Sequence, residues 1–336
     1  MVLSEMFQGT DDMVRRIPRD CSILEWAENP YVEANEDYSL IREGFLNTEL
    51  IVPISRNRRF CHDLHGLYAH WKYRTLFASE HFLAEQSQAI TEISDAAIFT
   101  ASANHWHFFV DGLANLSKTV LERCQTIYVD RHTSDDQIAF LGLCAEQLLG
   151  KRPNVEVLSE GNYALKNVIV PTNKPFGPKI KSLRSLLALI DPGARQAVTY
   201  DRIYVTRKGA KTRRLLNEDA MLSMLDNDFG FHAVENENLN LIEQMEFFNG
   251  ASVIMGPHGA GLTNIVFANE PKLLIELFNS LQQPFYPALA QALNASYMGF
   301  DGQAAPNANV GNDSDNAPFS VDVERVRRGL YEVLGQ

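Results

Sequence analysis

Residues 251–264 read Ala-Ser-Val-Ile-Met-Gly-Pro-His-Gly-Ala-Gly-Leu-Thr-Asn, and the rest of the fold is inferred outward from this stretch. The apolar run 253–255 predicts a buried parallel strand. Gly256 and Pro257 then interrupt the chain, and apolar residues recur at helical spacing from Leu262 onward. The pattern therefore predicts a strand, a glycine turn and a helix in direct succession.

A turn of this kind is suited to bind a phosphate. The first N–H groups of a helix lack internal partners, and the helix dipole places its positive end at the same point. Glycines let a ligand approach the backbone closely. The spacing matches neither a P-loop nor the G-x-G-x-x-G dinucleotide fingerprint, and a tight strand-to-helix turn without a ligand is the alternative interpretation. The candidate binding residues are His258, Gly259, Ala260, Gly261, Thr263 and Asn264.

The composition is that of a globular protein with room for two domains: 336 residues, of which 45% are hydrophobic and 21% charged. The formal net charge of -12 argues against a nucleic-acid binder. The sequence contains no apolar run of 18 residues, so we expect no transmembrane helix, and peripheral membrane contact is left open. The N-terminus predicts no signal peptide, and four scattered cysteines favour reduced thiols in a cytoplasmic protein.

Strands and helices alternate from about residue 96 onward. Candidate strands lie at 96–100, 126–130, 155–158 and 168–170, and again at 202–206, 231–234, 253–255 and 273–278. Such alternation predicts α/β domains with parallel sheets. Three prolines within 171–178 mark the best domain boundary. In the second half, Asn217 is predicted to cap the helix that follows.

Basic side chains gather between residues 202 and 214, directly after a predicted strand. Doubly wound sheets bind ligands at the carboxyl ends of their strands, and guanidinium groups bind phosphate through paired charged hydrogen bonds. We therefore predict a diphosphate clamp at Arg207, Arg213 and Arg214, with a solvated basic loop as the alternative. Glu276, near the end of a later strand, is predicted to accept the hydroxyls of a ribose or else to pair with a neighbouring residue.

The aromatic segment 104–111 provides a second candidate site, because it carries His105, His107 and Asp111. His107 and Asp111 are four residues apart, so on a helix they share one face. Either side chain is a candidate to remove a proton from an acceptor hydroxyl. The alternative is that the aspartate orients or caps while the histidines belong to the core.

No metal site is predicted. His62 and His65 have the spacing of a metal-binding pair, but no third ligand supports them. The Asp-x-Asp triplets at 226–228 and 313–315 do not follow apolar strands and are interpreted as turns. We expect no metal and no cofactor beyond a nucleotide-sugar co-substrate.

The chain resembles glycosyltransferase family 61 in its motifs. The likeness is specific over about 200–280, weaker over about 95–170, and absent before 60 and after 300. The residues that carry it are 202–207, Arg213 and Arg214, Asn217 and Glu218, Glu243 and Gln244, 256–264, Glu276, and His105 to Asp111 in the first half.

The resemblance implies a GT-B-like enzyme with two Rossmann-like domains facing an inter-domain cleft. The implied domains are an acceptor-side domain at 1–172 and a nucleotide-sugar domain at 173–318, with a C-terminal helix at 319–336 that packs back on the first. Such an enzyme moves a sugar from a nucleotide donor, usually a UDP-sugar, to a hydroxyl of a glycan acceptor with inversion. Bacterial relatives of this kind act in polysaccharide or capsule biosynthesis.

Three other classes of protein are weighed against this one. A nucleotide-sugar-binding protein without turnover would bind UDP and transfer nothing. A sugar-nucleotide isomerase or epimerase would need a nicotinamide site, and the missing dinucleotide fingerprint argues against it. A nucleic-acid binder is disfavoured by the acidity of the chain.

Overall fold

The computed structural model describes residues 32–47, 52–55, 91–99, 103–190, 199–279, 283–305 and 316–335. The chain divides into two units. The first unit comprises the residues up to 103 together with 115–134 and 145–174, and the second comprises 104–114, 135–144 and 175–336. The candidate residues His105, His107 and Asp111 thus belong to the second unit.

Aromatic packing accounts for this division. The buried ring of Phe109 lies edge-on to Phe140, with ring centroids 5.7 Å apart, and to Phe267, with centroids 5.2 Å apart. These contacts attach 104–114 and 135–144 to the second unit. Long-range contacts of this kind leave no local signal in the sequence, and the boundary between residues 172 and 173 stays a prediction.

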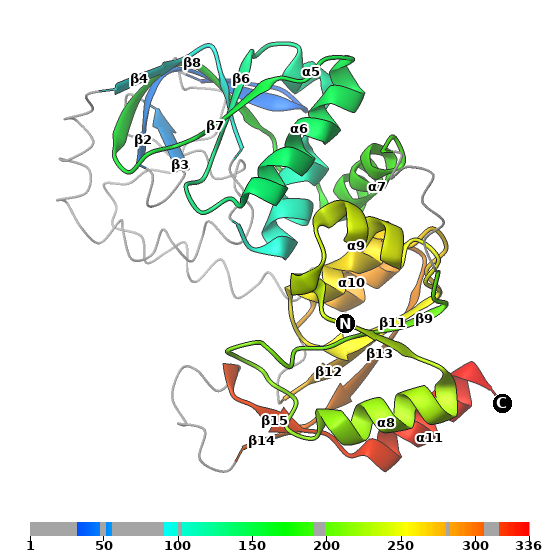
Figure 1. Cartoon of the computed structure of the whole chain (residues 1–336). Helices are drawn as coiled ribbons and strands as arrows, with labels where there is room; N and C mark the ends of the chain where they lie inside the picture. Colours follow the sequence, from blue (N-terminus) through cyan, green and yellow to red (C-terminus); the bar gives the residue numbers. More distant parts are fainter. Residues whose placement is uncertain are drawn as a thin grey trace. The chain divides into compact units, whose positions relative to one another are not determined.

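The first unit contains a mixed sheet with the strand order β1-β2-β8-β5-β6-β7, in which β3 also pairs with β2 and β4 with β8 (Figure 1). Strands β4 to β8 pair in parallel, as the alternating pattern predicts. Strand β2 pairs antiparallel with β1, β3 and β8, which the sequence did not predict. The strands are β1 (Val32–Ala34), β2 (Tyr38–Asn47), β3 (Val52–Ser55), β4 (Thr91–Ser94), β5 (Ala97–Ile98), β6 (Thr126–Val129), β7 (Asn154–Val157) and β8 (Asn162–Pro171).

Helical segments connect these strands. They are the π-helix η4 (His107–Gly112), the 3₁₀ turn η5 (Leu113–Asn115), α5 (Lys118–Leu121) and α6 (Asp135–Leu149). Gly150 ends α6 in the left-handed region, with φ of 71°. This is the C-terminal glycine stop expected from the sequence pattern.

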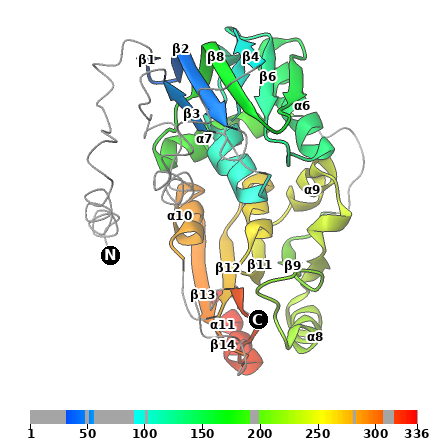
Figure 2. The same ribbon diagram turned by 90° about the vertical axis from the view of Figure 1, so that its left-hand side faces the viewer.

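The second unit contains a five-stranded parallel sheet in the order β10-β9-β11-β12-β13. Numbered along the chain this order is 2-1-3-4-5, a doubly wound arrangement. Figure 2 shows β9, β11, β12 and β13 side by side. The predicted α/β class with Rossmann-like parallel pairing is confirmed here. The strands are β9 (Arg202–Val205), β10 (His232–Val234), β11 (Val253–Pro257), β12 (Leu273–Phe278) and β13 (Ser296–Asp301).

The remaining elements of this unit flank or extend the sheet. They are α7 (Phe176–Leu187), α8 (Glu218–Phe229), the 3₁₀ turn η6 (Asn236–Asn238), α9 (Leu241–Phe248), the 3₁₀ helix η7 (Ala260–Phe267), α10 (Phe285–Ala292), the short antiparallel pair β14 (Gln303–Ala304) and β15 (Phe319–Ser320), and α11 (Val323–Leu334).

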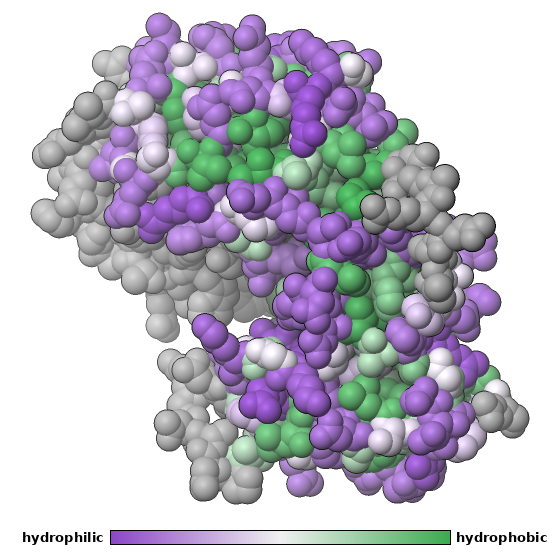
Figure 3. All heavy atoms as spheres, viewed as in Figure 1, coloured by the Kyte–Doolittle hydropathy of each residue, from purple (hydrophilic) through white to green (hydrophobic). Residues whose placement is uncertain are grey.

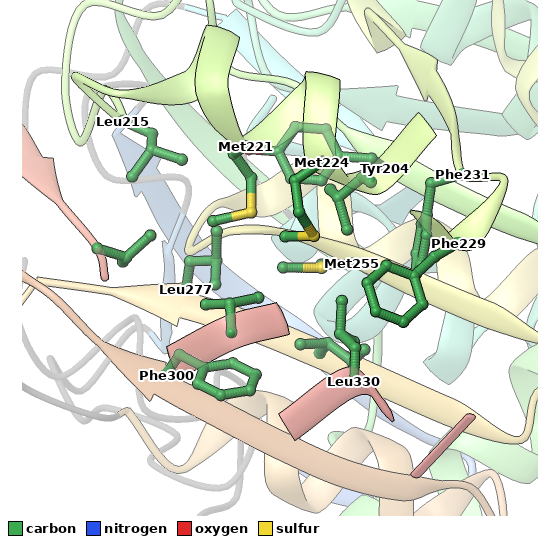
Figure 4. Close-up of a cluster of buried hydrophobic side chains, with 14 of the residues drawn as sticks. Tyr204, Leu215, Met221, Met224, Phe229, Phe231, Met255, Leu277, Phe300 and Leu330 are labelled. Atoms are coloured by element: carbon green, nitrogen blue, oxygen red, sulfur yellow. The ribbon is translucent and has the colours of Figure 1, made fainter. Parts of the chain in front are cut away.

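Helices α8 and α11 lie on one face of the sheet, and α9 and α10 lie on the other (Figure 1). On the α8 side, alternate strand residues such as Met255, Ile275 and Leu277 pack against Met221 and Leu330 (Figure 4). Alternation places every second side chain of a strand on one face. Glu276 therefore belongs to the opposite face, together with Leu274.

Helix α11 packs on α8. Val326 and Leu330 are buried in the same hydrophobic cluster, and Arg327 Nε lies 2.9 Å from the carboxylate of Asp228. Figure 3 shows hydrophilic residues, with smaller hydrophobic areas between them, on the outer side of α8 and α11. The apolar stripe of α11 is therefore buried within the second unit, and packing of 319–336 on the N-terminal domain stays a prediction.

Candidate functional site

The candidate site lies where the chain leaves β9 and β11 in opposite directions. From β9 the chain passes through α8 to the outer strand β10, whereas β11 leads toward β12. A switch of this kind leaves a crevice at the carboxyl ends of the two strands, where doubly wound sheets bind ligands. Arg207 follows β9, and His258 follows β11. Both belong to the second unit, as do the other candidate site residues.

The glycines of the turn make room for the protein's own atoms. A Cβ added at Gly259 would lie 1.9 Å from Nη1 of Arg207, and one at Gly261 would lie 2.8 Å from Nδ2 of Asn236. At Gly256 it would lie 2.6 Å from the carbonyl oxygen of Val205. Arg207, Asn236 and strand β9 therefore occupy the space beside these glycines, and the approach of a ligand to their backbone stays a prediction.

The predicted helix after the turn is present as the 3₁₀ helix η7. Arg184 of α7 holds its far end. Its guanidinium donates to the carbonyl oxygens of Val266 at 2.6 Å, Ala268 at 2.5 Å and Asn269 at 2.9 Å. A cation is favourable at the C-terminal end of a helix, where carbonyl groups lack partners.

Arg207 and Arg213 form a pair of like charges. Burial and, after it, the neighbouring charge of Arg213 lower the pKa of Arg207. The Nε atoms of both arginines are buried without a hydrogen-bond partner. Across the described part of the chain, no ion pair joins either guanidinium to a carboxylate within 4 Å. Two partly buried cations with unused donors form a site that favours an anion.

The loop that carries both arginines, residues 207–216, is fixed at its start by Glu218. The buried carboxylate of Glu218 accepts the backbone N–H of Arg207 at 3.2 Å and the hydroxyl of Tyr204 at 3.0 Å. Arg207 also donates from Nη2 to the carbonyl oxygen of Thr212 at 3.0 Å. The direction of the Arg207 side chain is therefore set by bonds at both of its ends. We call residues 207–216 the arginine loop.

The other basic residues of the cluster do not join this pair. Arg202 donates to the carbonyl oxygen of Phe229 at 2.8 Å, at the start of β9 and away from the crevice. Lys208, Lys211 and Arg214 are exposed, and Lys208 lies 3.5 Å from Asp219. The structure thus places Arg207 and Arg213 near each other, both partly buried, and leaves Arg214 exposed.

Glu276 is fully buried and is occupied by two neighbours. One carboxylate oxygen bonds to Nδ1 of His258, and the other accepts the hydroxyl of Tyr297 at 2.5 Å. The backbone N–H of His258 also bonds to Leu277 O at 2.7 Å. Glu276 therefore has the geometry of a residue that orients His258, which corresponds to the alternative of a neighbouring pair, and its role toward a ribose stays a prediction.

Tyr286 connects His258 to the glycine turn. Its buried hydroxyl donates to the carbonyl oxygen of Gly259, and its ring lies edge-on to the imidazole of His258 with centroids 5.5 Å apart. Burial raises the pKa of Tyr286 well above its usual value, so the group stays a neutral donor. Sequence reasoning missed Tyr286 and Tyr297, because a tyrosine on a helix or strand carries no motif.

His105 and Asn264 form a polar chain that fixes η7. His105 Nε2 bonds to Oδ1 of Asn264 at 2.5 Å, and Asn264 Nδ2 donates to Oε1 of Gln244 at 2.8 Å. Gln244 in turn donates to the carbonyl oxygens of Asn236 and Leu239. Burial lowers the pKa of His105 to about 4 against the opposing effect of its Asn264 bond, so the imidazole is neutral. His105 and Asn264 serve here to hold the turn.

His107 and Asp111 are brought together as the helical spacing predicts. Nδ1 of His107 lies 2.6 Å from one oxygen of Asp111, and Nζ of Lys179 lies 3.0 Å from the other. Burial raises the pKa of Asp111, but the hydrogen bond from His107 and the charge of Lys179 outweigh it and hold the pKa below its usual value. Asp111 is therefore ionised and holds the imidazole with Nδ1 as the protonated nitrogen.

Lys179 was missed by sequence reasoning, although a signal existed. It is buried on the same face of α7 as Ile180, Leu183 and Leu187. Lysine on the apolar face of an amphipathic helix is rare unless it is paired, and Asp111 is its partner. The ring centroids of Trp106, which precedes His107, and Tyr286, which bonds to the glycine turn, lie 5.4 Å apart. His107 and the glycine turn are therefore linked by one set of packed side chains.

No group of three His, Cys, Asp or Glu side chains suited to a metal occurs within the described ranges. The pair His62 and His65, and the triplet 313–315, lie outside them. Asp228, of the other triplet, pairs with Arg327 of α11. Among the helices of the described residues, none is long and apolar enough to cross a membrane.

A family model described as Glycosyltransferase 61 matches residues 68–275, which is more than half of the chain. That match contains the turn at the switch point and the arginine pair, together with most of the parallel sheet. The chain therefore belongs to glycosyltransferase family 61, and membership assigns it to the class of glycosyltransferases.

Three relatives share the name EGF domain-specific O-linked N-acetylglucosamine transferase. The Drosophila melanogaster protein is 32% identical over 96 residues, covering 28% of this chain and 18% of its own length. The Xenopus laevis protein is 25% identical over 138 residues, covering 38% and 26%. The Mus musculus protein is 25% identical over 101 residues, covering 29% and 19%. The alignments thus span about a fifth to a quarter of these relatives.

We expect Gly259→Ala to lower the free energy of unfolding by about 1–3 kcal/mol, because the added methyl group collides with Arg207. Gly209→Ala in the arginine loop is the matched control, since nothing lies within 4 Å of its added Cβ. Urea unfolding measures both. In the double variant Gly259→Ala/Arg207→Ala the shorter side chain at 207 removes the collision, so most of the lost free energy of unfolding should be recovered. If the losses of the two single variants simply add in the double variant, this contact is contradicted.

We expect the pH dependence of stability to change in His105→Gln, which keeps an N–H donor but does not titrate. Between the usual pKa of 6.5 and the folded value of about 4, the unfolded chain binds a proton at His105 that the folded protein does not. Stability of the wild type should therefore fall, relative to the variant, as pH drops through this window, by up to about 3 kcal/mol. Equal pH profiles would show that His105 is charged in the folded protein.

Proposed function

We propose that this protein is a glycosyltransferase that moves a sugar from a nucleotide donor, a UDP-sugar, to a hydroxyl group of an acceptor. The observation that carries the proposal is the pair Arg207 and Arg213 at the switch point between β9 and β11. Both guanidiniums have a buried Nε atom without a partner. A diphosphate supplies two negative groups and enough oxygens to satisfy these donors.

The electrostatics favour an anion that arrives with the substrate. Glu218 and Glu237 are near enough to raise the pKa of Arg207, yet burial and Arg213 lower it by more. The local positive charge is therefore not neutralised by the protein. In the transferase reaction the leaving nucleoside diphosphate gains negative charge as its bond to the sugar breaks, and fixed cations stabilise this charge.

His258 is proposed to complete this anion site. Glu276 and Tyr297 fix its ring through Nδ1 and the carboxylate, so Nε2 is the nitrogen that can approach a phosphate oxygen. The backbone N–H groups at Gly259, Ala260 and Gly261 are proposed as further donors, since the first N–H groups of a helix lack internal partners. Thr263 has a buried hydroxyl beside that of Tyr286, and Asn264 supports the turn from within.

The proposed general base is His107, with Asp111 and Lys179 as residues that position it. An ionised Asp111 whose pKa is lowered is a weak base, but it stabilises the imidazolium that forms on its neighbour. In the proposed step, Nε2 of His107 takes the proton of the acceptor hydroxyl. The acceptor oxygen bonds to the anomeric carbon, and the bond to the diphosphate breaks with its electrons on the phosphate oxygen. A single displacement of this kind inverts the configuration.

The sugar and the acceptor are proposed from the relatives and from the family resemblance. The relatives are named for N-acetylglucosamine and for EGF domains. UDP-N-acetylglucosamine is therefore the first donor to test. Four further parts of this proposal stem from the sequence. They are a glycan acceptor in polysaccharide or capsule biosynthesis, the GT-B architecture, a cytoplasmic location and independence from metal ions.

We expect Arg207→Ala to weaken UDP binding by about 10- to 100-fold, because charged hydrogen bonds to phosphate are lost. Lys208→Ala is the matched control: it removes the adjacent charge from an exposed position. A thermal-shift panel of UDP, GDP, CMP and their sugars identifies the nucleotide, since a ligand at 100 times its Kd adds ~2.7 kcal/mol of stability. Unchanged UDP affinity in Arg207→Ala would remove the basis of the proposal.

We expect His107→Gln to lower kcat for sugar transfer by about 10²–10⁴-fold while UDP affinity stays near that of the wild type. Asp111→Asn should lower kcat by less, because the base remains but loses its orienting charge. Sugar transfer and donor hydrolysis are measured with the donor found in the panel. Tight nucleotide-sugar binding by the wild type with neither reaction would instead identify a nucleotide-sugar-binding protein.

A further inference from the structure

The second half of the arginine loop is bonded to a segment near the C-terminus, residues 316–321, which we call the C-terminal strap. Arg213 N–H donates to the carbonyl oxygen of Asn316 at 2.9 Å. The backbone of Phe319 donates to Arg214 O at 3.0 Å and accepts from Leu216 N–H at 2.7 Å, which forms a parallel bridge beside Leu215. The strap therefore acts on the loop as a short neighbouring strand.

Asn217 adds a side-chain clamp to these backbone bonds. Its Nδ2 donates to the carbonyl oxygen of Val321 at 2.8 Å, and its Oδ1 accepts the N–H of the same residue at 3.3 Å. Asn217 stands at the N-cap position of α8, yet its side chain makes no cap bond. The sequence predicted a capping residue here. The side chain is used instead to join the start of α8 to the strap.

Backbone geometry shows why Arg213 needs such support. Its φ of 54° lies in the left-handed region, which disfavours residues other than glycine. Arg213 is partly buried, with a buried Nε atom, and its charge acts on Arg207, whereas the next residue, Arg214, is exposed. A conformation of this kind persists only where the surroundings impose it, and the bond to Asn316 is the direct restraint.

The strap is itself anchored in the core. Phe319 is fully buried in the cluster that contains Leu215 of the loop and Met221 of α8. Val321 leads into α11, whose Val326 and Leu330 pack in the same cluster. The position of the Arg213 backbone is thus tied to a rigid part of the second unit.

We propose that the C-terminal strap positions Arg213 for a diphosphate, through the bonds at Asn316, Phe319 and Asn217. This inference rests on the proposed function and adds a determinant of donor affinity in residues 316–321, which lie outside the family match at 68–275. Asn217 is a positioning residue, because it acts through Arg213 and not on the ligand. Without its clamp, the left-handed turn at Arg213 relaxes and the guanidinium leaves Arg207.

A double-mutant cycle tests the proposal, with UDP as the probe and calorimetric titration as the measurement. Asn217→Ala should weaken UDP binding by about five- to tenfold in the wild-type background, from two lost hydrogen bonds. In the Arg213→Ala background, the same change should weaken it by less than twofold, because the group through which Asn217 acts is gone. Asn227→Ala, at the other end of α8 with only a local bond to Ser223, is the control and should bind UDP normally.

The outcomes separate the two levels of inference. Equal losses from Asn217→Ala in both backgrounds, or no loss at all, overturn the strap proposal while the donor site stands. A wild type that binds no UDP, or an Arg213→Ala variant that binds it as tightly as the wild type, overturns the proposed function and the strap with it. Thermal unfolding of each unliganded variant verifies folding. Asn217→Ser, which keeps one hydroxyl near Val321, should show a smaller loss and serves if the alanine variant fails to fold.

Discussion

The main constraint on the candidate site is that two partly buried arginines lie close together and no carboxylate within the described residues forms an ion pair with them. Burial and the neighbouring charge of Arg213 lower the pKa of Arg207, and each of the two arginines retains an unused buried donor. The surrounding residues hold the two arginines in this arrangement. Glycine at position 259 leaves space for the guanidinium, Glu218 fixes the backbone at Arg207, and the C-terminal strap imposes a left-handed turn at Arg213. Because two like charges with unused donors destabilise the free protein, an anion that binds between them stabilises it.

Three sets of polar groups around the site are satisfied within each set. Glu276 binds His258 and Tyr297, Asp111 binds His107 and Lys179, and His105 leads through Asn264 to Gln244. Buried polar groups must be paired, and a paired group is also fixed in direction. These three sets therefore orient two imidazoles and the glycine turn, and they leave the arginines as the groups that need a ligand. This division between orienting and binding groups supports the proposed role of the site.

Much of this arrangement follows from local pattern. The alternation of strands and helices predicted the parallel sheet of the second unit, and the helical spacing of His107 and Asp111 predicted that they share a face. Position relative to a strand end selected Arg207 and His258, because the carboxyl ends of parallel strands meet at one edge of a sheet. The antiparallel strands of the first unit, the packing of α11 on α8 and the role of Lys179 were missed. Each depends on contacts between residues far apart in the sequence.

By itself, then, the sequence determined the class of fold, the family, and the short list of residues that carry charge to the switch point. This is possible because periodicity, glycine placement and motif spacing are local properties. Each residue type also limits the backbone conformations and the chemistry available at its own position. Tertiary structure alone decided which of these residues lie together at the switch point and which hold others in place. Arg213 faces inward while Arg214 is exposed, and Glu276 is enclosed by His258 and Tyr297. The reason is that burial and hydrogen-bond partners are set by distant segments, such as α7, the C-terminal strap and β13, whose proximity appears only once the chain has folded.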